Sequence, residues 1–382
     1  GAIGRRVIGF SLACSAASEV VVADISAEAA EREAAAWPGR ATALKLDVFD
    51  ETALRSAIRG VDAVLNCAGP FWRTSLPCLK AAIAEGRTYL DVCDGWETTR
   101  SLLELDGAAR DAHVAAVIGL GAAPGITNLL ARIAAAELDR CDEIVTGSNM
   151  DPDAPPQGDA LPGRAVHWQR QLGSEIDVWR DGKRATIDAL SHIHLNLPGY
   201  GARLLHAIGH PEPLTLPHVM PDLKNATHVL ALDRREAALA EGLEERVSAG
   251  KLTPERAAKM IADAGERPLD LRLRGLAALF SRRPTDTPPL FAYASGMRHH
   301  RHRRVGAWVQ RLPPGGTAGA AAAALAVGME LSLTRRLDRT GVSTPEDIVD
   351  PHVFFEEYAA PATPRGVAPG PLIHIETAET SA

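Results

Sequence analysis

The sequence predicts an α/β protein whose first part is a doubly wound parallel sheet and whose second part is a mixed α+β domain. Its 382 residues suffice for two or three folding units, and 46% hydrophobic with 23% charged residues is ordinary for a globular chain. Up to about residue 140, continuous apolar runs alternate with helical patterns, which indicates parallel strands covered on both faces. Beyond that point, turn signals separate short alternating runs, which indicates antiparallel pairing.

Strands and helices are expected to alternate in the first part. Residues 26–35 are rich in Ala and Glu, and Asp50 is placed to cap a helix whose apolar face includes Leu54 and Ile58. A right-handed, doubly wound order is the arrangement that such alternation favours. The expected strands are 19–24, 41–48, 62–67, 88–93 and 114–120.

The second part is expected to be built from hairpins and a helical subregion. Arg180–Lys183 has the residues of a hairpin turn between two alternating segments. A polar helical stretch covers 234–280, with Thr253 as a cap followed by Pro254. The other expected strands are 192–197, 226–232, 290–297 and 305–311.

The C-terminal region returns to helical patterns. Residues 317–336 are expected to form one long helix, and a short element follows Thr344. The end is rich in Pro, Ala and Thr and is expected to be mobile. The predicted organisation is a dinucleotide-binding domain at 1–138, an α+β domain at 139–314, C-terminal helices at 315–359 and a flexible tail at 360–382.

Composition and charge exclude several classes of protein. A net charge of −7 and a pI near 6.0 argue against a nucleic-acid binder, which needs a basic surface. Five scattered cysteines without a CxxC pair argue against a disulfide framework and a structural zinc site. The chain opens without a signal pattern, and its longest apolar stretch, 318–329, is too short to span a bilayer. We therefore expect a cytoplasmic protein in which this stretch is a buried helix.

Glycines at the start of the chain indicate a dinucleotide site. Gly1 and Gly4 lead into a helical segment, and Asp24 ends the next strand 20 residues after Gly4. This is the spacing of a Rossmann βαβ unit, in which the helix N-terminus faces the pyrophosphate and the acid binds the adenosine ribose. Asp24 repels a 2′-phosphate and favours NAD, while Arg5 and Arg6 leave NADP open. Because no strand precedes Gly1, we expect that the first strand of the sheet is missing.

Two further strand ends are expected to border the cofactor. Asp47 and Val48 end the third strand of the unit, at the point that borders the adenine, although Asp47 is equally well explained as a turn acid. The next strand ends in a turn of small residues that lets the cofactor pass close to the backbone. No Tyr in the chain is followed by Lys four positions later, which excludes the chemistry of the short-chain dehydrogenases. The turn consists of Cys67, Ala68, Gly69 and Pro70.

Five short motifs follow one another along the first part of the chain, and their order is characteristic of one family. They are 1–4, 46–48, 66–71, 89–92 and 119–128. Together with 210–217 and 345–355, they resemble the saccharopine dehydrogenase family of oxidoreductases over residues 1 to about 359. The resemblance implies a Rossmann domain, an α+β domain that binds substrate and forms a homodimer, and C-terminal helices that return to the first domain. It also implies an NAD(P)-dependent enzyme that transfers hydride at a C–N bond of an amino-acid-derived substrate.

One departure from the family affects the expected chemistry. Saccharopine-forming members carry Asp-Pro-Gly where this chain has Ala123–Gly125, so an acid/base candidate is missing. Asp91 and the nearby Asp94 are the ionisable groups that could serve instead, and His167 is a second catalytic candidate. The alternative for each aspartate is a cap on the following helix.

Substrate contacts are expected from two segments. His167-Trp168 resembles a Trp-containing segment of saccharopine reductases, and Arg164 stands where those enzymes tend to carry Lys. An arginine there suits a substrate carboxylate, and Trp168 suits the nicotinamide unless it anchors a helix to the hairpin. Asn128 lies in the first turn of a helix, where main-chain donors favour a carboxylate.

Two other features have plainer explanations. No metal site is predicted, because His300 and His302 in the basic run 298–304 lack a third ligand nearby in sequence. Residues 271–283 resemble a basic amphipathic helix, for which a dimer or core face is favoured over a membrane surface. A non-catalytic dinucleotide-binding protein, with or without attachment to a membrane surface, is the alternative to an enzyme.

Overall fold

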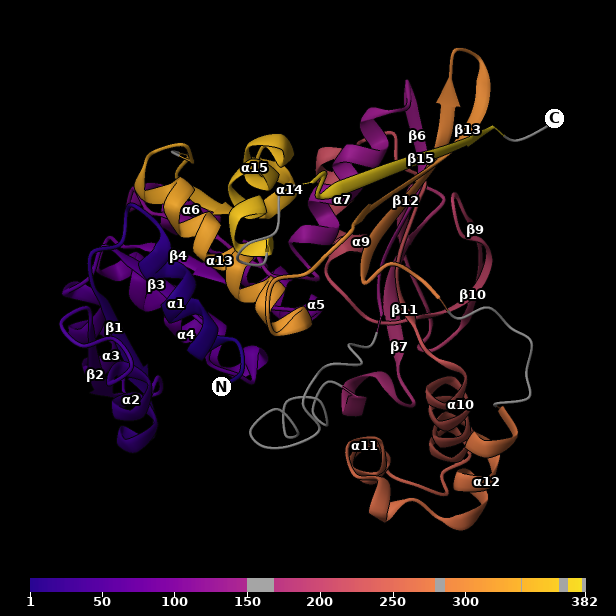
Figure 1. Cartoon of the computed structure of the whole chain (residues 1–382), viewed down its shortest axis with the longest axis horizontal. Coiled ribbons are helices and arrows are strands. Elements are labelled where there is room, and N and C mark those ends of the chain that lie inside the picture. The colour runs from indigo at the N-terminus through magenta and orange to yellow at the C-terminus, as the bar shows by residue number, and fades with distance from the viewer. Residues whose placement is uncertain (150–167, 279–285, 338, 364–369, 380–382) are drawn as a thin grey trace. The chain divides into compact units, whose positions relative to one another are not determined.

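The computed structural model describes residues 1–149, 168–278, 286–337, 339–363 and 370–379, and it divides into two compact units (Figure 1). Unit 1 consists of Gly1–Leu129 and Arg311–Leu372, and unit 2 of Leu130–Gln310 and Ile373–Ala382. The predicted fold class, a parallel α/β domain with an α+β domain, is confirmed. Unit 2 begins earlier than residue 139 and includes the C-terminal end of the chain.

Unit 1 contains parallel strands in two separate sheets. β1 pairs with β2 from Val20 opposite Ala41 to Asp24 opposite Lys45, and the second sheet has the order β14-β5-β4-β3. Among the described residues, β1 and β3 are not hydrogen-bonded to each other, so the expected single sheet is divided between them. The strands are β1 (Val20–Asp24), β2 (Ala41–Lys45), β3 (Ala63–Asn66), β4 (Thr88–Asp91), β5 (Ala115–Val117) and β14 (Gly341–Ser343).

Capping side chains start two successive helices of unit 1, α2 and α3. The Ser26 side chain accepts a hydrogen bond from the Ala29 amide at the start of α2, and Asp50 accepts one from Ala53 at the start of α3. The helices are α1 (Gly4–Ala13), α2 (Ala27–Ala34), α3 (Glu51–Arg59), α4 (Phe71–Ala84), α5 (Trp96–Leu103), α6 (Asp106–Asp111), α13 (Gly316–Leu333), α14 (Pro345–Ile348) and α15 (Pro351–Ala362). A further helix, α7 (Ile126–Ala136), begins in unit 1 and continues into unit 2.

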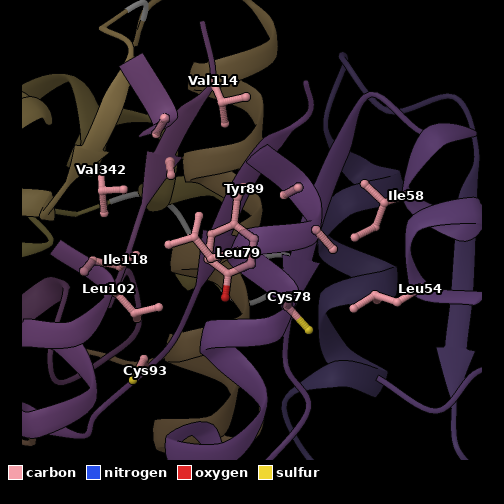
Figure 2. Close-up of a cluster of buried hydrophobic side chains, with 14 residues drawn as sticks. Leu54, Ile58, Cys78, Leu79, Tyr89, Cys93, Leu102, Val114, Ile118 and Val342 are labelled. Carbon is pink, nitrogen blue, oxygen red and sulfur yellow. The ribbon is translucent and has the colours of Figure 1, made fainter. Parts of the chain in front are cut away.

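The core of unit 1 surrounds β4 and β5. Figure 2 shows Tyr89 of β4 beside Leu79 and Cys78 of α4, with Leu54 and Ile58 of α3 on the far side of the cluster. Burying such side chains contributes roughly 1.5–3 kcal/mol each to folding, which fixes the strands whose ends carry the candidate site.

Helix α13 is a core helix despite its composition. Over 18 residues its mean hydropathy is 1.3, so it is long and apolar enough to cross a membrane, but 67% of it is buried within the structure. Gly328 packs so tightly that a Cβ at this position would clash with Leu120. The helix contacts α1, α15 and β4, which confirms the predicted buried helix.

Unit 2 is built on a nine-stranded sheet with the order β15-β13-β12-β6-β11-β10-β9, and β7 pairs with β11 and β8. All of its pairings are antiparallel except that between β6 and β11. The predicted hairpin turn between β7 and β8 is confirmed, with Asp181 and Gly182 both at positive φ. The strands are β6 (Arg140–Asn149), β7 (Glu175–Arg180), β8 (Lys183–Asp188), β9 (His192–Leu197), β10 (Gly201–Ala207), β11 (Asn225–Ala231), β12 (Leu290–Arg298), β13 (Arg301–Val309) and β15 (Ile373–Glu379).

The predicted helical stretch of unit 2 is divided by turns. Asp233 and Glu236 form a capping box at its start, and Thr253 caps the helix that Pro254 opens. Figure 1 shows α10, α11 and α12 gathered at one end of the sheet. The helices are α9 (Glu212–Val219), α10 (Arg234–Ser248), α11 (Pro254–Ala262), the 3-10 turn Ala264–Glu266 and α12 (Leu269–Ala278).

Two local predictions are wrong. The first is the flexible tail expected over 360–382, because parts of this range have regular structure. Helix α15 continues to Ala362, and Ile373–Glu379 forms β15, which pairs antiparallel with β13. Its β-branched residues suit an edge strand, a signal that the surrounding Pro and Ala obscured. The connection between the expected strands 290–297 and 305–311 is also shorter than predicted, because only His299 and His300 form the turn and Arg301 begins β13.

Candidate functional site

The predicted cofactor positions lie at the carboxyl ends of three strands of unit 1. Asp24 ends β1, and the Leu46 amide after β2 donates to the Asp24 carbonyl at 2.8 Å, so these two strand ends are adjacent. Gly4 opens α1, and a Cβ at Gly4 would lie 3.7 Å from the Cβ of Cys67 after β3. The structure therefore places the N-terminus of α1 beside the turn after β3, and it places the carboxyl ends of β1 and β2 side by side. Carboxyl ends of parallel strands and helix N-termini are where this fold binds a dinucleotide.

The two acids of this region are held by their own loops. The Asp24 carboxylate accepts a hydrogen bond from the Ser26 amide at 3.0 Å, and that of Asp47 accepts one from the Phe49 amide at 3.0 Å. Both contacts reach the amide two residues later and form local turns, and at Asp47 this agrees with the alternative interpretation as a turn acid. Val48 is half-buried and packs against the cluster of Figure 2, so its side chain serves the core.

The turn after β3 has the space that a cofactor needs. Ala68 and Gly69 are exposed, and a Cβ added at Gly69 or at Gly1 would meet no heavy atom within 4 Å. Burial raises the pKa of the Cys67 thiol to about 12, so this side chain is neutral beside the expected pyrophosphate. Pro70 then starts α4 as its N-cap residue. These features fit a dinucleotide, whose phosphates need close backbone approach and no nearby anion.

A buried hydrogen-bond network ties the ends of β3, β4 and β5 together. The Ala68 amide donates to the Asn66 side chain at 3.0 Å, and the Asn66 amide group donates to the Tyr89 hydroxyl at 3.1 Å. The Tyr89 hydroxyl in turn donates to Asp91 at 2.9 Å. The other Asp91 oxygen accepts from the amides of Gly119 at 2.7 Å and Cys93 at 3.1 Å. We call Asn66, Tyr89 and Asp91 the strand-end network.

Asp91 is the centre of this network and has no exposed surface. Burial raises its pKa above the usual value, although the amides of Gly119 and Cys93 and the Tyr89 hydroxyl oppose that rise. Burial and the neighbouring Asp91 also hold the pKa of Tyr89 well above its usual value. The geometry therefore makes Asp91 a positioning group for the Gly119 turn, whereas the adjacent Asp94 is partly exposed.

Asn128 closes the turn that follows β5. Its side-chain oxygen accepts the Gly125 amide at 2.8 Å, and the Asn128 side chain is buried. Gly125 has φ of 117°, and a Cβ there would clash with the backbone of Gly121, so this turn requires glycine. Asn128 is thus occupied in shaping the turn with its oxygen, and a contact from its amide nitrogen to substrate remains a prediction.

The remaining substrate and catalytic candidates are Arg164, His167 and Trp168. Arg164 and His167 lie outside the described residues. Trp168 is 4% exposed and belongs to a hydrophobic cluster that includes Leu172, Leu230 and Leu243. This position favours the anchoring role that was the alternative for Trp168, and its contact with the nicotinamide remains a prediction.

Sequence reasoning missed two groups of polar residues. Asn66 and Tyr89 were noticed only as parts of motifs, because their contact depends on the pairing of β3 with β4. In unit 2, Glu212 lies between two histidines, with His210 Nδ1 at 2.5 Å and His228 Nδ1 at 3.1 Å. All three side chains are buried, and we call them the buried His–Glu–His cluster. The closeness of His210 and Glu212 in sequence was a signal, but nothing in the sequence connects them with His228.

Comparison with known proteins agrees with this arrangement. Residues 1–117 match the family described as "Saccharopine dehydrogenase NADP binding domain". The chain is also similar to an apo, histidine-tagged saccharopine dehydrogenase (L-Glu forming) from Saccharomyces cerevisiae, with a TM-score of 0.65 and 14% identity over 99% of this chain and 98% of that one. An oxidoreductase from Agrobacterium radiobacter, in complex with NAD+, L-tartaric acid and magnesium, matches more weakly, with a TM-score of 0.43 and 8% identity over 94% and 92% of the two chains. The predicted resemblance is confirmed, and unit 1 carries a nicotinamide dinucleotide-binding domain.

Proposed function

We propose that this saccharopine dehydrogenase-like protein is an NAD(P)-dependent oxidoreductase that transfers hydride at a C–N bond of an amino-acid-derived substrate. The observation that carries the proposal is the approach of Gly4, at the start of α1, to the Cys67–Pro70 turn at the carboxyl edge of parallel strands. Asp24 likewise ends a parallel strand, β1. In this fold that edge is where a ligand binds. The nicotinamide, when bound, supplies or accepts the hydride, and the chain orients it.

The roles of the chain's residues follow from their positions. The N-terminus of α1, at Gly4, places main-chain amides and the positive end of the helix dipole at the pyrophosphate. The strand-end network holds the Cys67–Pro70 turn against the Gly119 turn, so both sides of the nicotinamide pocket are fixed before substrate binds. That rigidity favours hydride transfer, because the reacting carbon must approach the ring within a narrow range of geometry.

The group that transfers the proton is assigned by exposure. Ala123 has no ionisable side chain, and Asp91 is enclosed with both oxygens hydrogen-bonded. Asp94 follows Asp91 by three residues and is partly exposed, so we assign it as the proton-transfer candidate. Asp94→Asn is expected to lower kcat and remove one limb of its pH profile, with cofactor affinity unchanged. Asp91→Asn is instead expected to weaken cofactor binding and thermal stability together.

The test of the activity is turnover with matched substrate pairs. The purified protein is titrated with NADH and NADPH by fluorescence, and nicotinamide absorbance is then followed with a panel of amino acids and their keto-acid partners. Saturable cofactor binding with turnover of an amino or imino acid is expected. Saturable binding without any absorbance change across the panel would instead support the non-catalytic alternative, for which Ala123 in the acid position is the specific observation.

Cofactor preference depends on Asp24. Its carboxylate at the end of β1 supports NAD, because a 2′-phosphate placed there meets a negative charge. Lys45 is the partner of Asp24 in the β1–β2 register and is the nearby cation that favours the opposite choice. Asp24→Ala is expected to raise NADPH affinity relative to NADH by about tenfold, since one close charge contact is worth on the order of 1.4 kcal/mol at such a site. A native protein that binds NADPH more tightly than NADH contradicts the assignment of Asp24, and Asp47→Ala is the matched control.

A further inference from the structure

A second group of polar side chains meets at the edge of the sheet in unit 2. His192 on β9 and His206 on β10 are direct partners in the antiparallel ladder, so their side chains lie next to each other. Glu241, on α10, approaches both of them. Two imidazoles and one carboxylate, from β9, β10 and α10, therefore lie next to one another.

The distances between these side chains are those of metal ligands. Glu241 Oε1 lies 3.2 Å from His192 Nε2 and 3.3 Å from His206 Nε2. All three ligand atoms lie within 4.8 Å of one another. A tetrahedral ion with bonds of about 2.0–2.1 Å separates its ligand atoms by about 3.3–3.4 Å. The two distances from Glu241 match this separation, and the two imidazole nitrogens lie within 4.8 Å of each other.

The surroundings provide both rigidity and access. His206 is buried, and its ring meets that of His192 edge-on at 5.3 Å between centroids. The His192 side chain is 46% exposed, so an ion can enter from solvent. Arg274 lies 3.9 Å from the other oxygen of Glu241 but is bound closely by Glu245, at 2.7 Å and 2.8 Å. That pairing offsets the arginine charge and leaves Oε1 directed at the two histidines.

We propose that His192, His206 and Glu241 form a binding site for a divalent transition-metal ion such as Zn²⁺. Two imidazoles and a carboxylate are ligands that this class of ion prefers over Mg²⁺ or Ca²⁺. Three protein ligands leave a fourth position for water, on the side where His192 is exposed. Binding joins α10 to the β9–β10 edge, so the ion stabilises this part of unit 2.

The buried His–Glu–His cluster has the same residue types but a different character. Its rings are stacked at 4.0 Å between centroids, and Glu212 and His228 have no exposed surface, so this cluster lacks the solvent-facing ligand that His192 provides in the other group. Its carboxylate is already engaged by both imidazoles, at 2.5 Å from His210 Nδ1 and 3.1 Å from His228 Nδ1. The proposal therefore concerns the accessible group alone.

The experiment measures binding of Zn²⁺ by calorimetry and of Co²⁺ by absorption, with the full chain. One ion per chain is expected, and the cobalt spectrum should show four-coordinate bands without the thiolate charge-transfer band that a cysteine site gives. His192→Ala and Glu241→Gln should each weaken affinity by about 100-fold or more, because even losing an outer-shell partner costs 10–100-fold. The same variants should lose the rise in melting temperature that Zn²⁺ produces in the native protein.

His194→Ala is the matched control, since His194 is an exposed histidine two residues along the same strand. It should bind Zn²⁺ as the native protein does. The proposal is overturned if native protein binds no ion, if His192→Ala binds equally well, or if His194→Ala loses binding to the same degree. A thiolate-type cobalt spectrum also overturns it. Far-UV circular dichroism of each variant without metal verifies that the fold is retained.

Discussion

Unit 1 and unit 2 each enclose a carboxylate completely, and they accommodate it in opposite ways. Asp91 in unit 1 accepts hydrogen bonds from two main-chain amides and one tyrosine, and burial raises its pKa. Glu212 in unit 2 lies between two histidines. Although burial by itself raises the pKa of Glu212, the charges and hydrogen bonds of His210 and His228 hold it well below the usual range.

The difference shows that burial does not determine a carboxylate's protonation without its partners. At Asp91, neutral hydrogen-bond donors stabilise the anion less than desolvation destabilises it, so the pKa is raised. At Glu212, the charges of the neighbouring histidines stabilise the anion more than desolvation destabilises it, so the pKa is lowered. Asp91 fixes a turn that the cofactor region needs, and its charge is secondary. Glu212 and its histidines are a charged unit whose members depend on one another.

The largest effect is expected from removing the charge of Glu212. Glu212→Gln leaves a buried histidine cation without its counter-charge, which should cost about 3–5 kcal/mol of unfolding free energy near neutral pH. The folded-state pKa of Glu212 lies below its usual value, so this contribution is present above about pH 4.3 and declines as pH falls through the folded pKa. Urea unfolding at several pH values measures it.

Glu236→Gln is the matched control for that variant, because Gln preserves the capping box of α10 and the residue is only partly buried. It should change stability by only a few tenths of a kcal/mol. A loss at Glu212→Gln no greater than at Glu236→Gln would show that the cluster is uncharged in the fold.

A smaller effect with the opposite pH dependence is expected at Asp91. Asp91→Asn keeps one acceptor for the Gly119 amide but places an NH₂ group in the network, which should cost about 1–3 kcal/mol. The folded-state pKa of Asp91 is raised, so its contribution is fully present below about pH 3.9 and declines as pH rises through the folded pKa. The stability difference between native protein and variant should therefore shrink as pH rises.

Asp94→Asn tests whether that pH dependence belongs to Asp91, since Asp94 is nearby but partly exposed. Its unfolding free energy should follow that of native protein across the pH range. A difference at Asp91→Asn that grows with pH would mean that Asp91, like Glu212, is stabilised as an anion.

The sequence predicted those features that local pattern determines. The turn at Arg180–Lys183 and the caps at Asp50 and Thr253 each depend on a few neighbouring residues, and the structure has them. The approach of Gly4 to the turn after β3 was also predictable, because helix starts and the carboxyl ends of parallel strands lie at the same edge of such a sheet.

Features that depend on distant partners were not predictable in this way. The role of Asp91 depends on Tyr89 from its own strand and on the Gly119 amide from the next. β14 has three residues, too few for a pattern, and is identified only by its pairing with β5. Trp168 has the same local sequence whether it faces a ligand or a core, so only its contacts show its surroundings.

The smallest effect is expected at Glu85, which resembles Glu212 in its partners but not in their burial. Glu85 accepts Arg55 Nε at 2.7 Å and Arg59 Nε at 2.8 Å, and these contacts lower its pKa to about 2. The two arginine side chains are 41% and 65% exposed, so solvent and salt screen the pairing. Glu85→Gln should thus destabilise the protein less than either buried variant.

The pH dependence at Glu85 should have the sign found at Glu212. Its stabilisation is present above about pH 4.3 and is lost as pH falls toward about 2, and molar NaCl should reduce it at any pH. Glu51→Gln, an exposed acid 3.9 Å from Arg55, is the matched control and should cost less. If Glu85→Gln costs as much as Glu212→Gln, then the number of cationic partners determines the strength of the pairing. If the cost of Glu85→Gln is small and salt-sensitive, then burial of the cations determines the strength of the pairing. The reason is that water replaces the lost carboxylate around an exposed arginine and cannot do so around a buried histidine.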